Sequence, residues 1–148
     1  MSNKYYKSIE DIKDNRTFIF GQIWQVKDEL ISIPNADRLN NRNLHFSRCI
    51  IIVQNNLNNF NPESVIISVA PISSRTDCER ENDVILLKDK DEVKEDSIIM
   101  LDYIQPLLKI DLYRCVGEIS EESKYDVYFN ISNMFGYASK EVAATEEE

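Results

Sequence analysis

The sequence predicts a mainly β fold: a small antiparallel β-barrel that carries a C-terminal amphipathic helix. Short segments rich in β-branched and aromatic residues recur along the chain, polar turns separate them, and helical spacing is clear only near the end. The 148 residues suit one domain. We divide the chain into an N-terminal extension (1–16), a barrel domain (17–137) and an acidic tail (138–148) that we expect to be disordered.

The predicted strands begin with residues 17–26, which are rich in β-branched and aromatic residues. Gly21 interrupts this strand and indicates a bulge or a close approach of backbone. Residues 50–53 are all β-branched and apolar, which is typical of a strand covered on both faces, so we place it at the centre of the barrel. Further strands are expected at residues 64–72, 83–87, 97–101 and 115–119.

After Ser120 the apolar residues take on helical spacing. Ser120 is a suitable N-cap and Gly136 a suitable C-cap. The predicted buried face consists of Val127, Tyr128, Ile131, Met134 and Phe135. The aromatic residues of this helix, which also include Tyr125 and Phe129, could stack on nucleobases, but at this spacing we expect them in the core.

Composition argues against several classes of function. Three glycines are too few for a glycine-rich phosphate loop, and one histidine cannot form a two-histidine ribonuclease site. The three cysteines include no Cys-x-x-Cys pair, so neither a disulfide framework nor a structural zinc site is expected. No apolar run is long enough to span a membrane and no signal peptide is evident. We therefore expect a cytoplasmic protein that needs no metal and no cofactor.

The formal net charge of −9 argues against a general nucleic-acid coat protein. The charge is uneven, however, because residues 38–48 contain three arginines and the one histidine but no acidic residue. An anionic ligand could be bound there. The acidic remainder of the chain would suit a basic protein partner.

Arg48 lies where a long polar connection, residues 27–47, enters the central strand. Its guanidinium stays charged and offers a planar fork of donors suited to phosphate. Ser73, Ser74 and Arg75 follow the next strand, and in an antiparallel pair the start of one strand lies beside the end of its neighbour. The two groups could thus donate together to the non-bridging oxygens of a phosphodiester, and RNA would supply its own 2′-hydroxyl nucleophile.

More ordinary interpretations of these residues remain open. Arg48 could simply end a strand in solvent, and residues 73–76 could be a polar turn. His45 could transfer protons, because imidazole titrates near neutral pH, but a single loop histidine more often faces solvent. Cys49 is better interpreted as a small buried hydrophobe than as a nucleophile.

The order of these motifs resembles the MazF/PemK toxins. The resemblance rests on Gly21-Gln22-Ile23-Trp24, a long loop, the segment 47–55, the segment 62–74 and the segment 96–105, and it covers about residues 18–135. The family's usual Gly-Gly-x-Arg-Pro at the junction of loop and strand is replaced here by His45-Phe46-Ser47-Arg48-Cys49, which changes the loop backbone.

The resemblance implies an SH3-like barrel with a C-terminal helix, a homodimer, and metal-independent cleavage of single-stranded RNA by the toxin of a type II toxin–antitoxin system. It places the catalytic arginine at Arg48 and its hydroxyl partner at Ser73, with possible assistance from His45, Ser74 and Arg75. We expect RNA contacts from Arg38, Arg42 and Gln54, and an antitoxin that covers the RNA groove. The alternatives are a CcdB-like barrel that inhibits a protein target without catalysis, and an adaptor barrel whose loop holds a peptide.

Overall fold

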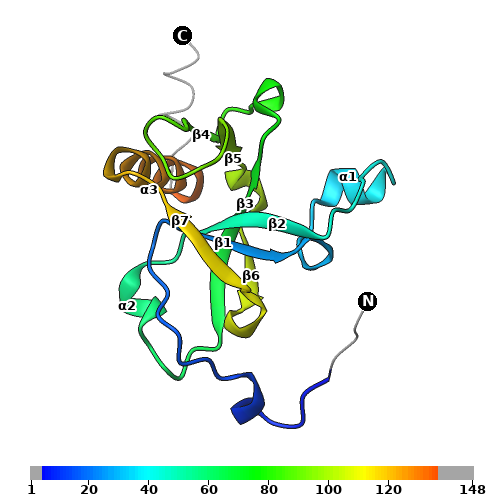
Figure 1. The fold of residues 1–148 in the computed structure, drawn as a ribbon, viewed down its shortest axis with the longest axis vertical. Helices are drawn as coiled ribbons and strands as arrows, with labels where there is room; N and C mark the ends of the chain where they lie inside the picture. The colour runs from blue at the N-terminus through cyan, green and yellow to red at the C-terminus, as the bar shows by residue number, and fades with distance from the viewer. Residues whose placement is uncertain (1–4, 137–148) are drawn as a thin grey trace.

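The computed structural model describes residues 5–136. Within them the chain forms a curled antiparallel sheet, a half-barrel, with one long helix near the C-terminus (Figure 1), which confirms the predicted mainly β class. The predicted tail, residues 138–148, lies outside the described residues, and the division at residue 16 stays a prediction. No helix in the described part combines the length and the apolar character needed to cross a membrane.

Residues 5–136 form seven strands and three α-helices. The strands are β1 (Gln22–Lys27), β2 (Ser47–Ile52), β3 (Ile66–Ser73), β4 (Val84–Leu86), β5 (Ser97–Ile99), β6 (Gln105–Leu108) and β7 (Arg114–Glu118). The helices are α1 (Pro34–Arg38), α2 (Asn56–Asn59) and α3 (Glu121–Phe135), and short 3₁₀ turns lie at Ile9–Ile12, Asp28–Leu30, Thr76–Cys78, Leu101–Tyr103 and Lys109–Asp111. The strand order is β4-β5-β3-β2-β1-β7, and β6 pairs with β3.

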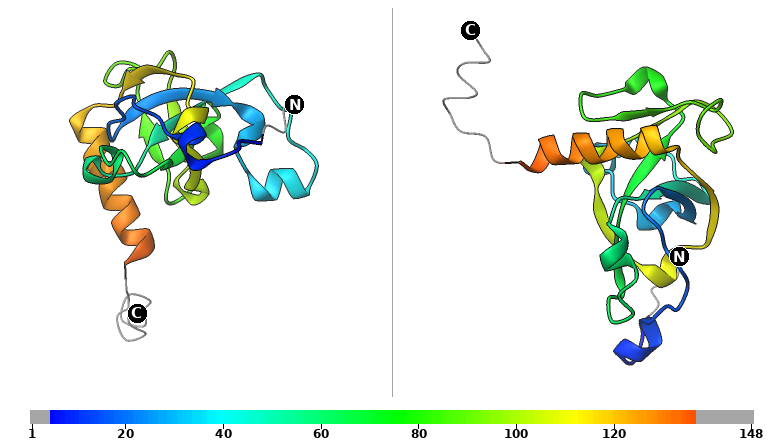
Figure 2. Two further views of the ribbon diagram at one scale, coloured as in Figure 1. Left: turned by 90° about the horizontal axis from the view of Figure 1, so that it is seen from below. Right: turned by 90° about the vertical axis from the view of Figure 1, so that its left-hand side faces the viewer.

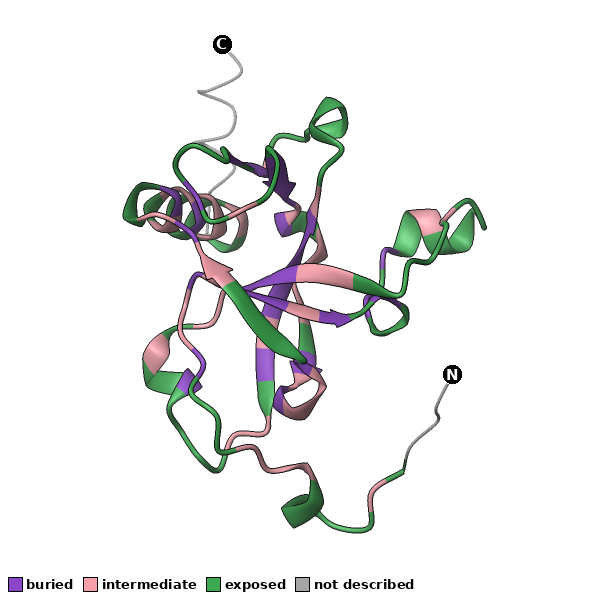
Figure 3. Ribbon diagram, in the orientation of Figure 1, coloured by how far each residue is buried: buried purple, intermediate pink, exposed green. Residues whose placement is uncertain are grey.

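Strand β2 lies near the middle of this sheet and is covered on both faces, as its sequence predicts. Ile50 and Ile52 belong to one buried cluster, whereas Ile51 belongs to the other. All three side chains are inaccessible to solvent, and burial of each is worth about 2 kcal/mol. Figure 3 shows the buried residues concentrated on the central strands. The strand is therefore a rigid base for Arg48, its second residue.

The first strand is shorter than predicted, because β1 begins at Gln22 and not at Thr17. Gly21 precedes it with a φ of +89°, and a Cβ there would lie 2.7 Å from Cε of Lys124 in α3. The predicted close backbone approach is thus confirmed, and its partner is a helix side chain. The pairing of β1 with β7 also shifts register between Ile23 and Trp24.

Helix α3 begins after Ser120, whose side chain accepts a hydrogen bond from the N–H of Ser123 at 3.1 Å, as its N-cap role predicts. Figure 2 shows α3 at one end of the curled sheet. The predicted buried face was too wide: Val127 is buried and Ile131 and Met134 pack against the core, but four aromatic residues are exposed. They are Tyr125, Tyr128, Phe129 and Phe135. Because α3 packs against one end of the sheet, only a narrow stripe of its side chains is buried.

Candidate active site

Strands β2 and β3 bring Arg48 and Ser73 to the same edge of the sheet. The two strands are antiparallel with Ile50 opposite Pro71, and continuing this register by two pairs sets Arg48 opposite Ser73. Nη1 of Arg48 also donates to the carbonyl oxygen of Ile72 at 3.3 Å. The start of β2 therefore lies beside the end of β3, as the sequence predicts.

A cavity of about 910 Å³ lies at this edge, and we call it the Arg48 cavity. It is lined by Ile23, Gln25, His45, Ser47, Arg48, Cys49, Ile72, Ser73, Ser74, Arg75, Glu92, Val93, Lys94, Glu95, Ser97, Arg114, Cys115 and Val116. All five residues predicted to be catalytic or assisting thus share one cavity. Arg38, Arg42 and Gln54, the predicted RNA contacts, do not line it.

The Arg48 side chain is held by a buried carboxylate, that of Asp28. Nε of Arg48 donates to Oδ1 of Asp28 at 2.6 Å, and the two side chains are 15% and 0% exposed. Such a charge-assisted bond away from solvent fixes the guanidinium much more firmly than a surface pair does. Nη2 of Arg48 makes no hydrogen bond within residues 5–136, so it is available to a ligand in the cavity.

Asp28 also organises the loop that precedes β2. Its Oδ1 accepts from Nη2 of Arg42 at 2.5 Å, and its Oδ2 accepts from the backbone N–H of His45 at 2.9 Å. Burial alone would raise the pKa of the Asp28 carboxyl, but the hydrogen bonds from Arg48, His45 and Arg42 outweigh burial and lower it. The carboxylate is thus charged at neutral pH and balances two arginines.

Arg42, predicted to contact RNA, is turned into the protein. Besides Asp28 Oδ1, its guanidinium donates to the carbonyl oxygens of Ile31 at 2.6 Å and Asp28 at 2.8 Å, and to Oδ1 of Asp37 at 3.0 Å. These four bonds fasten the loop to α1 and to the end of β1. RNA binding by Arg42 stays a prediction. In the structure the hydrogen bonds of its guanidinium hold the loop in place.

The end of β3 is held more loosely. The hydroxyl of Ser73 accepts the backbone N–H of Arg75 at 3.1 Å, and Ser74 is exposed. Arg75 pairs with Asp77 through bonds of 3.1 Å, but these two side chains are 70% and 68% exposed. The Ser73 hydroxyl hydrogen is free to turn toward a ligand, because the oxygen serves here as an acceptor.

Of the other predicted site residues, one lies at the Arg48 cavity and two lie outside it. His45 is exposed at the rim of the Arg48 cavity. Arg38 is exposed at the end of α1. Gln54 follows the opposite end of β2, where its side chain bonds to Asn59 at 3.0 Å and to the N–H of Ser68 at 3.3 Å. The structure therefore separates Gln54 from the cavity by the length of the strand.

The wall of the Arg48 cavity carries charges of both signs. Arg75, Lys94 and Arg114 add cations to Arg48, while Glu92 and Glu95 add carboxylates. Burial raises the pKa of the Cys49 thiol, which therefore remains protonated at neutral pH and is a poor nucleophile. Within residues 5–136 no three histidine, cysteine, aspartate or glutamate side chains gather as metal ligands would.

Sequence reasoning missed Asp28, the residue on which this arrangement depends. A signal for it exists: Asp28 follows the end of β1, which pairs with the start of β2, so the antiparallel argument that linked Arg48 with Ser73 applies to it as well. The sequence also did not predict that Lys94 and Arg114 line the cavity. Lys94 lies in a turn and Arg114 begins a short strand, and neither setting indicates a binding role.

Comparisons with known proteins agree with the fold. Residues 35–135 match the family model described as PemK-like, MazF-like toxin of type II toxin-antitoxin system. That match spans β2 to α3 and includes Arg48 and Ser73. No curated protein matches the chain significantly by sequence alone.

Several solved structures share the fold at low sequence identity. An endoribonuclease from a mycobacterial species has a TM-score of 0.59 and 14% identity over 84% of this chain and 96% of its own. The complex of a mycobacterial endoribonuclease with its cognate antitoxin gives 0.57 and 14%, over 83% of this chain and 97% of its own. The MazE-MazF complex from Deinococcus radiodurans gives 0.57 and 12%, over 84% of this chain and 100% of the other.

Proposed function

The chain belongs to the PemK-like, MazF-like toxins of type II toxin–antitoxin systems, and from this premise we propose that it is an endoribonuclease that cleaves single-stranded RNA without a metal ion. The observation that carries the proposal is the meeting of Arg48 and Ser73 in one cavity, with the guanidinium held by buried Asp28. The similar structures described as endoribonucleases support RNA cleavage over inhibition of a protein target without catalysis.

In the proposed reaction the 2′-hydroxyl oxygen of the RNA attacks the adjacent phosphorus. A new bond forms between the 2′ oxygen and phosphorus, and the bond from phosphorus to the 5′ oxygen breaks. The products are a 2′,3′-cyclic phosphate and a 5′-hydroxyl, and water supplies the proton that the leaving oxygen takes up. His45 at the rim of the cavity is our candidate to accept the proton from the 2′-hydroxyl.

Arg48 and Ser73 would stabilise the negative charge that builds on the non-bridging oxygens. Nη2 of Arg48 is the free arm that meets the phosphate, while its Nε and Nη1 stay bound to Asp28 and to the carbonyl of Ile72. Donors fixed before the reaction cost no reorganisation during it, which is why a buried anchor for the guanidinium matters. The Ser73 hydroxyl adds a second donor, and Ser74 and Arg75 assist at the same edge.

We also propose, from the family and its antitoxin-bound members, that an antitoxin protein inhibits this toxin by covering the Arg48 cavity, and that the toxin acts as a homodimer in the cytoplasm. Residues 17–137 would be the catalytic unit. Arg38 is the predicted RNA contact whose side chain is exposed, so it is the one we carry forward for this role.

The proposal is tested by incubating the purified protein with single-stranded RNA in the presence of a chelator. The wild type is expected to leave 2′,3′-cyclic phosphate ends, and Arg48→Ala to lower the rate about 100-fold or more, as loss of one charge-stabilising donor does. Arg80→Ala is the matched control, because Arg80 lies outside the cavity. Fluorescence of the buried Trp24 reports whether each variant is folded. Equal rates for the two arginine variants, or no cleavage by the wild type, would contradict the proposal.

A further inference from the structure

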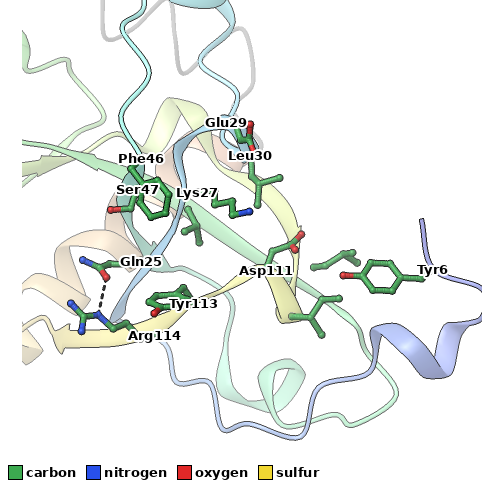
Figure 4. A pocket seen from close by; sticks show the side chains of 13 residues that line it. Tyr6, Gln25, Lys27, Glu29, Leu30, Phe46, Ser47, Asp111, Tyr113 and Arg114 are labelled. Carbon is green, nitrogen blue, oxygen red and sulfur yellow. Dashed lines mark hydrogen bonds between the residues drawn. The ribbon is translucent and has the colours of Figure 1, made fainter. Parts of the chain in front are cut away.

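A second cavity, of about 710 Å³, adjoins the Arg48 cavity. Gln25, Ser47 and Arg114, from β1, β2 and β7, line both cavities, so the two cavities are neighbours on this part of the sheet. We call the second cavity the Phe46 cavity (Figure 4). Part of its wall comes from Tyr6, from residues 25–27 and from residues 29–30, which precede the segment matched by the family model.

Two exposed aromatic rings, those of Phe46 and Tyr113, line this cavity together with Lys27 (Figure 4). Phe46 and Tyr113 are 88% and 75% exposed, yet their backbones are fixed to the sheet. The carbonyl of Phe46 accepts the N–H of Asp28 at 3.4 Å, and the N–H of Tyr113 donates to the carbonyl of Gln25 at 2.7 Å. Exposed rings on anchored backbones are the usual platform on which nucleobases stack.

The polar groups of the cavity suit an RNA strand that continues out of the Arg48 cavity. Nε of Arg114 donates to Oε1 of Gln25 at 2.8 Å, and its two terminal nitrogens make no hydrogen bond within residues 5–136. The ammonium of Lys27 likewise makes no ion pair with any described residue. Both cations can therefore meet phosphates beside the stacked base.

The half-buried carboxylate of Asp111 supplies a hydrogen-bond acceptor. It accepts no hydrogen bond from the described residues. Burial raises its pKa, an effect that nearby Lys27 only partly offsets. A carboxylate accepts readily from the exocyclic amine of cytosine, whereas uracil would present a carbonyl oxygen to it.

We propose that the Phe46 cavity binds one nucleobase of the RNA beside the cleaved phosphodiester, with Phe46 and Tyr113 stacking on it and Asp111 selecting a base with an exocyclic amine over uracil. This inference rests on the proposed ribonuclease function. It adds which part of the RNA substrate binds next to the Arg48 cavity. Lys27 and Arg114, which make no ion pair with any described residue, lie next to the Arg48 cavity and favour an RNA strand over a peptide.

The test measures binding without cleavage. The probes are fluorescein-labelled oligodeoxycytidine and oligodeoxyuridine of about eight nucleotides, a length within the range that such grooves bind. They lack the 2′-hydroxyl and so stay intact, and the two bases differ in the group presented to Asp111. Anisotropy at fixed salt should show about fivefold tighter binding of the cytosine oligomer to the wild type, the effect of one well-placed hydrogen bond.

Asp111→Asn should bring the two affinities to near equality, since an amide can donate to uracil as well as accept. Asp89→Asn, an exposed acid outside both cavities, should keep the preference. Phe46→Ala should weaken both oligomers about tenfold and leave their ratio unchanged, and Tyr113→Ala should do the same. Phe60→Ala is the control for these two, as Phe60 is an exposed phenylalanine outside both cavities.

Each outcome decides the inference separately from the proposed function. Equal binding of the two oligomers by the wild type, no binding of either, or unchanged affinity in Phe46→Ala and Tyr113→Ala would overturn the inference. Loss of the preference in Asp89→Asn as well as in Asp111→Asn would do so too. Wild type that binds as expected but cleaves no RNA would overturn only the proposed function. If an antitoxin peptide inhibited RNA cleavage while the oligonucleotides did not bind, the cavity would be assigned to the peptide. That result would also overturn the inference.

Discussion

Two arginines of the Arg48 cavity are each paired with an aspartate, but the two pairs differ in burial. Arg48 and Asp28 are 15% and 0% exposed, whereas Arg75 and Asp77 are 70% and 68% exposed. Asp28 receives further hydrogen bonds from Arg42 and from the backbone of His45, whereas the Arg75–Asp77 pair is local in sequence and faces water. One cation is therefore fixed in place, and the other can adjust.

This difference teaches where preorganisation resides in the site. A buried pair that also holds a loop resists movement, because breaking it leaves an uncompensated charge in a poorly solvated place. An exposed pair is screened and easily replaced by water. We therefore expect substitutions on the Arg48 side to affect both stability and catalysis, and substitutions on the Arg75 side to affect neither strongly.

The largest effect is expected from Arg48→Lys. A lysine keeps the charge, but a single ammonium cannot bond Asp28, the carbonyl of Ile72 and a phosphate together as the guanidinium fork can. The kcat/KM of RNA cleavage should fall about 100-fold or more. Arg75→Lys should stay within about a few-fold of wild type, since it alters an exposed pair. A comparable loss in both variants would erase the distinction between the two arginines.

Asp28→Asn should have the next largest effect. The amide carries no charge to balance Arg42 and Arg48, and it offers one acceptor oxygen where the carboxylate offers two. The free energy of unfolding, from urea denaturation, should fall by about 3 kcal/mol, and cleavage should slow about tenfold through misplacement of Arg48. A variant as stable and as active as wild type would show that the buried anchor is dispensable.

The pH dependence of that stability difference is a finer test. The folded-state pKa of Asp28 is lowered, so its charged form stabilises the fold above the unfolded-state pKa of about 3.9. That contribution is lost as pH falls through the folded-state pKa. The gap in unfolding free energy between wild type and Asp28→Asn should thus be widest near neutral pH and should narrow below about pH 4. A gap that is constant with pH would mean that the charge of Asp28 does not stabilise the fold.

The smallest effect is expected from Asp77→Asn. Hydrogen bonding to Arg75 lowers the pKa of Asp77, but the pair is exposed and its energy is largely screened. Urea midpoint and cleavage rate should match those of wild type within error. A clear loss of activity would instead place the 75–77 turn among the parts of the site that must be held rigid.

The sequence was sufficient to predict that Arg48 and Ser73 lie together, because that follows from one rule about antiparallel neighbours applied to two well-marked strands. It was not sufficient for the partners of the charged residues. Arg42 was assigned to RNA because it lies in a basic loop, whereas its acceptors come from backbone and side chains of the segment 28–37 that only the folded loop brings near. Charge alone does not indicate whether a loop arginine points outward.

The C-terminal helix shows a second limit. Its existence, start and N-cap were predictable from local spacing, but the width of its buried face depends on how it meets the sheet. Tyr128 and Phe135 belong to a plausible apolar face by spacing, yet both are exposed because α3 crosses one end of the sheet and buries only the stripe around Val127. Packing angle is a tertiary property that periodicity does not encode.

The central claim is that Arg48 and Ser73 act on the same phosphodiester, and a double-mutant cycle on cleavage tests it most directly. The kcat/KM for RNA in the presence of a chelator is measured for wild type, Arg48→Ala, Ser73→Ala and the double variant. Residues that act as a unit show losses far from additive, so the double variant should be about as slow as Arg48→Ala alone. If the two losses instead multiply, or if Ser73→Ala cleaves as fast as wild type, the two side chains do not share one reaction centre.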